Sequence, residues 1–227
     1  MERLVARELM DDESFGTLDQ WRGALHDLCK VNRFLGGWAA LRAEVERMPV
    51  APWRILDVGA GGADLSKCLL AELDSRGVSA HCIALDRSPR VLELARGFGG
   101  FGPALRFEQG DAQELPFADR SFDLAMMNLA LHHFDPDAAV VVLRELARVA
   151  THVIVNDLRR SRIAWAFARF VFPLFTRNPL TRNDGPLSVR RAYSPSEVAR
   201  LAQRTGWQKI DVRTYLGYRM TLAGGFA

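Results

Sequence analysis

The chain has 227 residues, of which 48% are hydrophobic and 25% are charged, and 30 basic residues stand against 27 acidic ones. These proportions are those of a globular protein, so they exclude an intrinsically disordered or fibrous chain. The net charge of +3 is too small to indicate a nucleic-acid-binding protein. The length is enough to bury a sizeable core, and a single domain is expected.

The N-terminal and apolar segments give no sign of secretion or of membrane insertion. Residues 1–8 mix charges from the start and lack the apolar core of a secretory signal. The longest apolar segment, residues 163–175, is interrupted by Arg169 and Pro173 and is shorter than the ~20 residues that cross a bilayer. A cytoplasmic location is therefore expected. The cysteines have no CxxC spacing, so neither a disulfide framework nor a metal site is expected.

The order of the predicted elements is that of an α/β protein. Apolar residues at spacings of three and four predict two or three helices within residues 1–50, and Pro49 and Pro52 end this helical part. Strands and helices then alternate, which implies a mostly parallel sheet with helices on both faces. The strands are predicted at 53–58, 80–86, 105–109, 122–128 and 152–156, and the helices at 63–74, 89–96 and 135–148.

After the fifth strand the pattern becomes less regular. Residues 158–192 are predicted to form an irregular insert that is rich in arginine and aromatic residues. Ser194, Pro195 and Glu197 then fit the N-cap, the first position and the capping-box position of a helix. Gly206 is expected to end that helix.

The C-terminal residues predict an antiparallel hairpin. Its strands are expected at Trp207–Tyr215 and Arg219–Ala223, with the turn near Leu216-Gly217. The single domain of residues 1–227 is thus expected to have four parts. These are an N-terminal helical cap at 1–50, a core of alternating strands and helices at 51–157, an insert at 158–192 and a C-terminal helix and hairpin at 193–227.

The most informative stretch is the glycine turn after the first predicted strand, Asp57-Val58-Gly59-Ala60-Gly61-Gly62-Ala63-Asp64. Gly59 and Gly61 allow backbone conformations and close approaches that a Cβ would block. The helix that follows presents its first N–H groups to a ligand. Such a turn suits both dinucleotides and adenosyl compounds. Asp64 occupies the third glycine position of the dinucleotide pattern, and a carboxylate there repels a pyrophosphate but tolerates a sulfonium or amino group.

Polar residues follow the next strands at the edge where open α/β sheets bind ligands. Asp86 ends the second predicted strand and could accept hydrogen bonds from both ribose hydroxyls, although it would also suit a helix cap. Asp111, after the third strand, could accept a hydrogen bond from an adenine amino group. Asn128 and Leu129 end the fourth strand and could form the floor of the cofactor site.

Together these motifs resemble the class I S-adenosylmethionine-dependent methyltransferases, especially the group similar to ubiquinone/menaquinone biosynthesis C-methyltransferases. The resemblance implies a three-layer Rossmann-like fold with a mostly parallel seven-stranded sheet and a C-terminal antiparallel hairpin. It also implies S-adenosyl-L-methionine as cofactor. It covers roughly residues 50–157. The motifs are Leu56-Asp57-Val58-Gly59-Ala60-Gly61, Asp86, Gly110-Asp111-Ala112 with Leu115-Pro116-Phe117, and Ser121-Phe122-Asp123 leading to Leu131-His132-His133-Phe134.

The resemblance also implies where the cofactor binds. The segment Asn32–Gly37 resembles one that folds over the cofactor in related enzymes, so Arg33 is expected to pair with the donor's carboxylate. Gly62-Ala63 departs from the third glycine of many relatives, and Ala63 is expected to be small enough for normal helix packing. The expected cofactor-binding residues are Arg33, Asp57, Gly59, Ala60, Gly61, Asp64, Asp86, Arg87, Asp111, Ala112, Asn128 and Leu129.

Three residues are candidates for catalysis by proton transfer. His132 and His133 follow the fourth strand near the expected methyl group, and His133 is the preferred general base. An imidazole that only fills space beside Phe134 is the alternative. Asp157, at the end of the fifth strand, is the second candidate base, and a helix cap is its alternative role.

The acceptor is expected to be a small aromatic, polyketide-like, quinone-like or lipid-like molecule that is methylated on oxygen or carbon. The aromatic residues of the insert could form a lid over it, or could pack as an ordinary core. The arginines of the insert could attract an anionic acceptor, a carrier-bound acyl chain or a membrane surface, or could lie in solvent. The aromatic residues are Trp165, Phe167, Phe170, Phe172 and Phe175.

Two other classes of function remain open from the sequence. One is a nicotinamide-dependent oxidoreductase, and the other is a non-catalytic protein that binds an adenosyl ligand. Nucleic acid is not an expected partner, because the chain shows no recognition module and no Asn-Pro-Pro-Tyr-type motif after the fourth strand. A homodimer is left open.

Overall fold

The computed structural model describes residues 1–99 and 102–225, and its centre is a seven-stranded sheet of order β3-β2-β1-β4-β5-β7-β6. Neighbours among β1 to β5 pair in parallel, whereas β7 pairs antiparallel with both β5 and β6. The predicted sheet and hairpin are therefore confirmed. The strands are β1 (Arg54–Val58), β2 (His81–Asp86), β3 (Leu105–Gln109), β4 (Phe122–Asn128), β5 (Ala150–Leu158), β6 (Lys209–Tyr215) and β7 (Arg219–Gly225).

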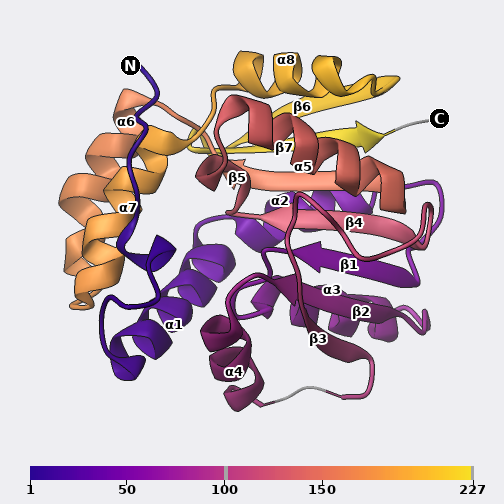
Figure 1. The fold of residues 1–227 in the computed structure, drawn as a ribbon, viewed down its shortest axis with the longest axis horizontal. Coiled ribbons are helices and arrows are strands. Elements are labelled where there is room, and N and C mark those ends of the chain that lie inside the picture. The colour runs from indigo at the N-terminus through magenta and orange to yellow at the C-terminus, as the bar shows by residue number, and fades with distance from the viewer. Residues whose placement is uncertain (100–101, 226–227) are drawn as a thin grey trace.

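Helices cover both faces of this sheet, as Figure 1 shows. The apolar strands β1, β4 and β5 alternate their side chains between two buried clusters, one beneath α2 and α3 and the other beneath α5 and α8. Strands buried on both faces explain the nearly continuous apolar runs in the sequence. The α-helices are α1 (Leu18–Phe34), α2 (Gly37–Val45), α3 (Asp64–Ser75), α4 (Pro89–Gly97), α5 (Pro136–Val149), α6 (Arg162–Ala166), α7 (Pro179–Arg191) and α8 (Pro195–Thr205).

Helices α1, α6 and α7 gather beyond the carboxyl ends of the parallel strands (Figure 1). Short helical segments complete this part of the molecule, and the N-terminal residues run along α7, where the Leu4 N–H donates to the carbonyl of Arg190. The ligand-binding edge of the sheet is therefore enclosed by segments from both ends of the chain. The short segments are η1 (Leu9–Asp11), η2 (Leu131–His133), the π-helical η3 (Phe167–Val171) and η4 (Phe172–Leu174).

The insert is more helical than the sequence suggests, so the prediction of an irregular segment is wrong. Asn178 caps α7 by accepting a hydrogen bond from the Leu180 N–H, and Pro179 occupies the first turn. Pro186 lies inside α7 and removes one backbone donor, which is why this stretch resembles a loop in the sequence. The insert thus supplies a largely helical wall beside the sheet edge.

The remaining boundaries are close to those predicted. Ser194 caps α8 with the expected capping box, and Gly206 ends that helix in a left-handed conformation. Strand β5 is longer than expected at both ends because the β4 and β7 ladders continue to pair with it. Within the described residues, no helix combines the length and apolar character needed to cross a membrane.

Candidate active site

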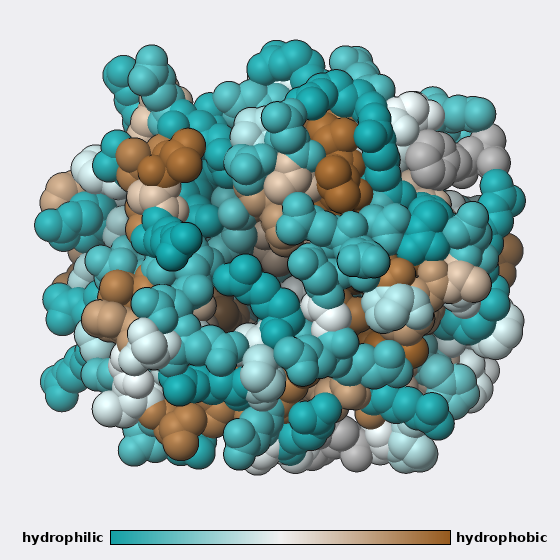
Figure 2. All heavy atoms as spheres, viewed as in Figure 1, coloured by the Kyte–Doolittle hydropathy of each residue, from teal (hydrophilic) through white to brown (hydrophobic). Residues whose placement is uncertain are grey.

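A cavity of about 660 Å³ lies at the carboxyl ends of β1, β2 and β4 and is closed by α1, η1 and α7. In the space-filling view of Figure 2, a dark recess between the helices on the left and the sheet breaks a mostly hydrophilic surface. All of the predicted site residues line this cavity except Arg33 and Asp157. The sequence motifs therefore meet in one place.

The glycine turn is held tightly against β2. The N–H groups of Gly59 and Ala60 both donate to the carbonyl of Leu85, at 2.8 and 3.1 Å. Gly59 has φ +69°, and a Cβ on it would lie 2.9 Å from the Cβ of Ala130, so a side chain there would clash. Ala63 also adopts a left-handed conformation, with φ +52°, and α3 begins at the next residue, one residue later than predicted.

Asp86 closes the turn from the side of β2. Its Oδ2 accepts a hydrogen bond from the Gly61 N–H at 3.0 Å, and its Oδ1 accepts one from the Ser88 N–H at 3.0 Å. Burial raises the pKa of the Asp86 carboxyl above its usual range. The N-cap of α4 is Ser88, whose hydroxyl accepts from the Val91 N–H. The helix-cap alternative for Asp86 is therefore excluded, and its carboxylate lies at the cavity wall.

Asp57 lies at the base of the site, almost completely buried. The Ser66 hydroxyl donates to its Oδ2 at 2.6 Å, and the Asn128 amide donates to its Oδ1 at 3.4 Å. Burial, reinforced by the nearby carboxylates of Asp64 and Asp86, raises the pKa of Asp57 to about 7. Asp57 thus links β1, α3 and β4 behind the glycine turn.

Asp57→Asn is expected to stabilise the ligand-free protein at neutral pH. Because the folded-state pKa of about 7 exceeds the ordinary value of 3.8, the folded protein binds more protons than the unfolded chain between these values. Its free energy of unfolding therefore falls as the pH rises from about 4 to 7, by on the order of 4 kcal/mol. Asparagine does not ionise, so the variant lacks this pH dependence of the free energy of unfolding. Urea unfolding of both proteins at pH 5 and pH 8 measures the effect.

Asp123→Asn is the matched control at the opposite end of the sheet. The Asp123 carboxylate accepts hydrogen bonds from the backbone and side chain of Arg54, and this pairing lowers its pKa despite partial burial, which opposes it. This variant should be less stable than the wild type at pH 8. Equal pH dependence in Asp57→Asn and the wild type would contradict the role assigned to Asp57.

The cavity contains a pair of opposite charges, of which the sequence indicated Asp64 but not Arg219. Arg219, on β7, is fully buried, and burial lowers its pKa to about 10. Its Nη2 donates to Asn32 Oδ1 at 3.0 Å and its Nε donates to the Leu35 carbonyl at 2.8 Å. The amide of Asn32 donates in turn to Asp64 Oδ1 at 3.3 Å. Burial raises the pKa of Asp64.

Arg33 is placed differently from the prediction. It is exposed, its guanidinium lies over the ring of Phe34, and it does not line the cavity. The α-helical phase of α1 turns the neighbouring Asn32 inward instead. The cation that faces this part of the cavity is Arg219, and the expectation for Arg33 is corrected accordingly.

The other predicted cofactor residues form the rim of the cavity. Asp111 is exposed, and its Oδ1 accepts a hydrogen bond from the Gln113 N–H at 2.8 Å in a tight turn that also contains Ala112. Arg87 is exposed at the same rim. Leu129 has φ +51°, and its N–H donates to the Asn156 carbonyl, which bends the chain at the end of β4.

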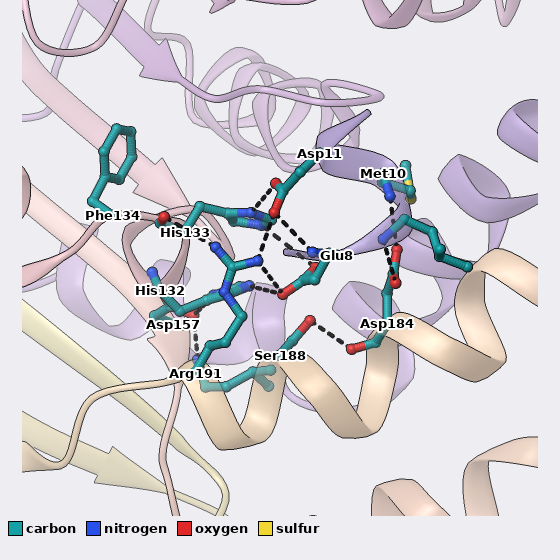
Figure 3. Close-up of polar contacts among 12 residues, drawn as sticks. Glu8, Met10, Asp11, His132, His133, Phe134, Asp157, Asp184, Ser188 and Arg191 are labelled. Carbon is teal, nitrogen blue, oxygen red and sulfur yellow. Dashed lines mark hydrogen bonds and ion pairs between the residues drawn. The ribbon is translucent and has the colours of Figure 1, made fainter. Parts of the chain in front are cut away.

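Beyond β4 the two histidines enter a network of buried carboxylates, drawn in Figure 3. His132 Nδ1 lies 2.7 Å from Asp157 Oδ1, and His133 Nδ1 lies 2.8 Å from Asp11 Oδ1. The Nε2 atoms of both rings face Glu8, at 3.6 Å for His132 and 3.7 Å for His133. Glu8 and Asp11 come from the N-terminal segment, whose distance in sequence gives no sign of this contact.

The electrostatics of this network differ from one carboxylate to the next. Burial raises the pKa of Glu8 to about 7. Burial also opposes ionisation of Asp157, but His132 outweighs it and the pKa of Asp157 is lowered. Asp157 also accepts hydrogen bonds from the N–H groups of His132 and Leu158 and does not line the cavity. It therefore orients His132 and is not placed as a base, while the cap of α6 is Ser161.

Only part of the aromatic insert faces the cavity. Phe167 and Phe172 line it, and Phe167 stacks on Tyr218 with ring centroids 6.2 Å apart. Phe170 and Phe175 are 65% and 71% exposed. The predicted lid is thus reduced to Phe167 and Phe172.

Comparisons with known proteins agree with this geometry. Residues 55–152 match a family model described as a methyltransferase domain. The chain is 35% identical over 101 residues to the uncharacterized methyltransferase YcgJ of Bacillus subtilis, covering 44% of this chain and 37% of that protein. It is 34% identical over 99 residues to a demethylmenaquinone methyltransferase of Deinococcus radiodurans, covering 43% of this chain and 39% of that protein.

The fold is also shared with solved structures. Human N-acetylserotonin methyltransferase in complex with S-adenosylmethionine superimposes with a TM-score of 0.70 at 15% identity, over 99% of this chain and 60% of that one. The chain spans about two fifths of the length of the curated relatives named above. Residues 55–152 therefore form a methyltransferase domain, and the chain has the Rossmann-like fold of the class I S-adenosylmethionine-dependent methyltransferases, with similarity to the menaquinone C-methyltransferase group.

Proposed function

We propose that the chain transfers a methyl group from S-adenosyl-L-methionine, the cofactor of its family, to oxygen or carbon of a small aromatic, polyketide-like or quinone-like acceptor. One observation carries the proposal: a single cavity contains Asp86 at the end of β2 together with Asp64 and Arg219 beside the glycine turn. These groups complement a ribose, an ammonium group and a carboxylate. The similarity to a demethylmenaquinone methyltransferase supports the acceptor class.

The residues of the cavity fit this cofactor. Arg219 is a buried guanidinium whose hydrogen bonds to the described residues all go to neutral oxygens, those of Leu35, Asn32 and Asn156, and it faces the cavity. A ligand carboxylate there would compensate its charge. Asn32 separates Arg219 from Asp64, so the two charges can bind the two ends of an amino-acid group. Asp86 has the geometry to accept hydrogen bonds from vicinal hydroxyls.

Methyl transfer requires little covalent chemistry from the chain. When bound, S-adenosyl-L-methionine supplies an electrophilic methyl group. The residues around the cavity have to hold the acceptor in line with it and exclude water. The acceptor's proton is proposed to leave at the imidazole pair, where the Nδ1 contacts with Asp157 and Asp11 leave Nε2 as the basic atom. His133 is the more exposed ring and is the proposed base.

The acceptor is proposed to lie between this imidazole pair and the wall formed by Phe167 and Phe172. Aromatic walls favour flat apolar molecules, because such molecules gain most from burial against a ring. We therefore expect phenols and quinols to be methylated in preference to sugars and aliphatic amines. A screen of both sets with radiolabelled donor measures this preference, and faster turnover of the polar set would contradict it.

Phe172→Ala is expected to raise the KM for a phenolic or quinol acceptor by roughly 10- to 100-fold, because it removes apolar contact area worth about 1.5–3 kcal/mol. Phe170→Ala is the matched control, since the same change is made in the same segment on a ring that is 65% exposed. Its KM should equal that of the wild type. If both substitutions raised the KM equally, the proposal that Phe172 contacts the acceptor would be contradicted.

A further inference from the structure

We propose that Glu8, His132 and His133 form a binding site for a divalent transition-metal ion of the zinc type at the acceptor end of the cavity. One ligand atom from each residue lies within 4.8 Å of the other two. The two Nε2 atoms lie 3.6 and 3.7 Å from the oxygens of Glu8. Two ligands on a tetrahedral zinc ion, each bound at about 2.0–2.2 Å, are roughly 3.4 Å apart. Small side-chain movements therefore suffice for coordination.

The outer contacts of the two imidazoles are those of metal ligands. A metal-bound histidine commonly donates its second ring N–H to a carboxylate, which fixes the tautomer and orients the ring. Asp157 occupies this position at His132 and Asp11 occupies it at His133, at 2.7 and 2.8 Å. Both Nε2 atoms thereby lie on the side of Glu8, and Figure 3 draws their contacts with its carboxylate.

Glu8 supplies an independent indication of a ligand. Its side chain is only 5% exposed, and its Oε1 is a buried oxygen that accepts no hydrogen bond from the described residues. A buried carboxylate oxygen without a hydrogen-bond donor is costly. Arg191 Nη1 lies 3.4 Å from this oxygen, but it donates instead to Asp11 Oδ2 at 2.6 Å. The space between Glu8 and the imidazoles is where a cation would satisfy the oxygen.

The excess of negative charge around the two imidazoles also favours a bound cation. Glu8, Asp11 and Asp157 contribute three carboxylates, and Arg191 contributes one guanidinium. Arg3 also lies close, since its Nη2 donates to the His132 carbonyl at 3.0 Å, so with neutral imidazoles the three carboxylates exceed the two guanidiniums by one charge. A cation bound between Glu8 and the imidazoles offsets this excess of negative charge. Two nitrogen ligands and one carboxylate are a donor set typical of zinc and its neighbours and unlike that of magnesium or calcium.

The catalytic role of the ion rests on the proposed methyl transfer. In the metal-bound protein the ion would occupy both Nε2 atoms and activate the acceptor, so His133 acts as the proposed base only in the metal-free protein. Held by Glu8, His132 and His133, the ion would lower the pKa of an acceptor hydroxyl, whose proton would leave to water. The acceptor oxygen would form its bond to the methyl carbon as the carbon–sulfur bond of the donor breaks, and S-adenosylhomocysteine would leave. The cavity that reaches Glu8, His132 and His133 also passes Phe167 and Phe172, which brings such an acceptor to the ion.

Metal titration of the full chain after treatment with a chelator tests the site. The wild type should bind one Zn²⁺ per chain by calorimetry, and Co²⁺ at the same site should give visible absorption bands. Glu8→Gln should weaken Zn²⁺ binding at least 10-fold, because it removes the anionic ligand. His81→Ala is the control for adventitious binding, since His81 is exposed and far from the cluster in the sheet. It should bind as the wild type does.

Either of two results would overturn the metal site. These are no stoichiometric Zn²⁺ binding by the wild type, or binding that Glu8→Gln and His133→Gln leave unchanged. Circular dichroism checks that each variant is folded, and His133→Gln serves if Glu8→Gln is not. Calorimetry with S-adenosylhomocysteine on the same samples separates the two proposals: donor binding without metal binding refutes only the metal site, whereas loss of donor binding in the wild type refutes the proposed function.

Discussion

Replacing Asp86 by alanine is expected to weaken the binding of S-adenosylhomocysteine about 100-fold. The Asp86 carboxylate is proposed to accept two hydrogen bonds from the ribose, and hydrogen bonds to a charged group contribute about 1.5–3 kcal/mol each. The same carboxylate accepts the Gly61 and Ser88 N–H groups at 3.0 Å, so its loss also loosens the glycine turn. A total near 3 kcal/mol corresponds to roughly two orders of magnitude in Kd. Calorimetry at constant pH measures it.

Asp123→Asn serves as the control, because Asp123 lies at the amino end of β4 and does not line the cavity. Its donor affinity should match that of the wild type. Unchanged affinity in Asp86→Ala would show that the ribose assignment is wrong, even if the family assignment holds.

Arg219→Met is expected to weaken S-adenosylhomocysteine binding by roughly 10- to 100-fold. Methionine keeps much of the apolar length of the side chain but removes the guanidinium, which is proposed to bind the amino-acid carboxylate through a charge-assisted hydrogen bond of about 1.5–3 kcal/mol. The substitution also leaves the Leu35 carbonyl and Asn32 Oδ1 without their donors, so a lower Tm is expected as well. Calorimetry and thermal unfolding measure the two effects.

Two controls separate binding from folding. Methylthioadenosine, which lacks the carboxylate and ammonium groups, should bind Arg219→Met as tightly as it binds the wild type, which also shows that the variant is folded. Arg33→Met should leave both ligands unaffected, because Arg33 is exposed beside Phe34. If Arg33→Met weakened S-adenosylhomocysteine binding and Arg219→Met did not, Arg33 and not Arg219 would be the residue that binds the amino-acid carboxylate.

The sequence predicted the sheet and the glycine turn well because their signals are local. The apolar runs of β1, β4 and β5 follow from burial on both faces. The turn requires glycine at position 59, since the Ala130 side chain and a positive φ exclude a Cβ there. Asp86 was found because the end of a strand adjacent to such a turn always faces the ligand edge of the sheet.

The rest of the site depends on contacts between distant parts of the chain. Arg219 appears in the sequence as one charged residue in a predicted strand, and only the pairing of β7 with β5 brings it to the buried Asn156. Glu8 and Asp11 reach the histidines across more than 120 residues, in a segment whose pattern suggested no function. The choice of Arg33 failed because adjacent side chains on an α-helix point about 100° apart, and Asn32 takes the inward direction.

Calorimetric titration of the wild-type protein with S-adenosylmethionine, S-adenosylhomocysteine and NADH tests the central claim most directly. The account predicts that both adenosyl ligands bind with a stoichiometry of one and that NADH does not bind, since Asp64 lies where a pyrophosphate would have to approach the turn. Binding of NADH without binding of either adenosyl ligand would contradict the account.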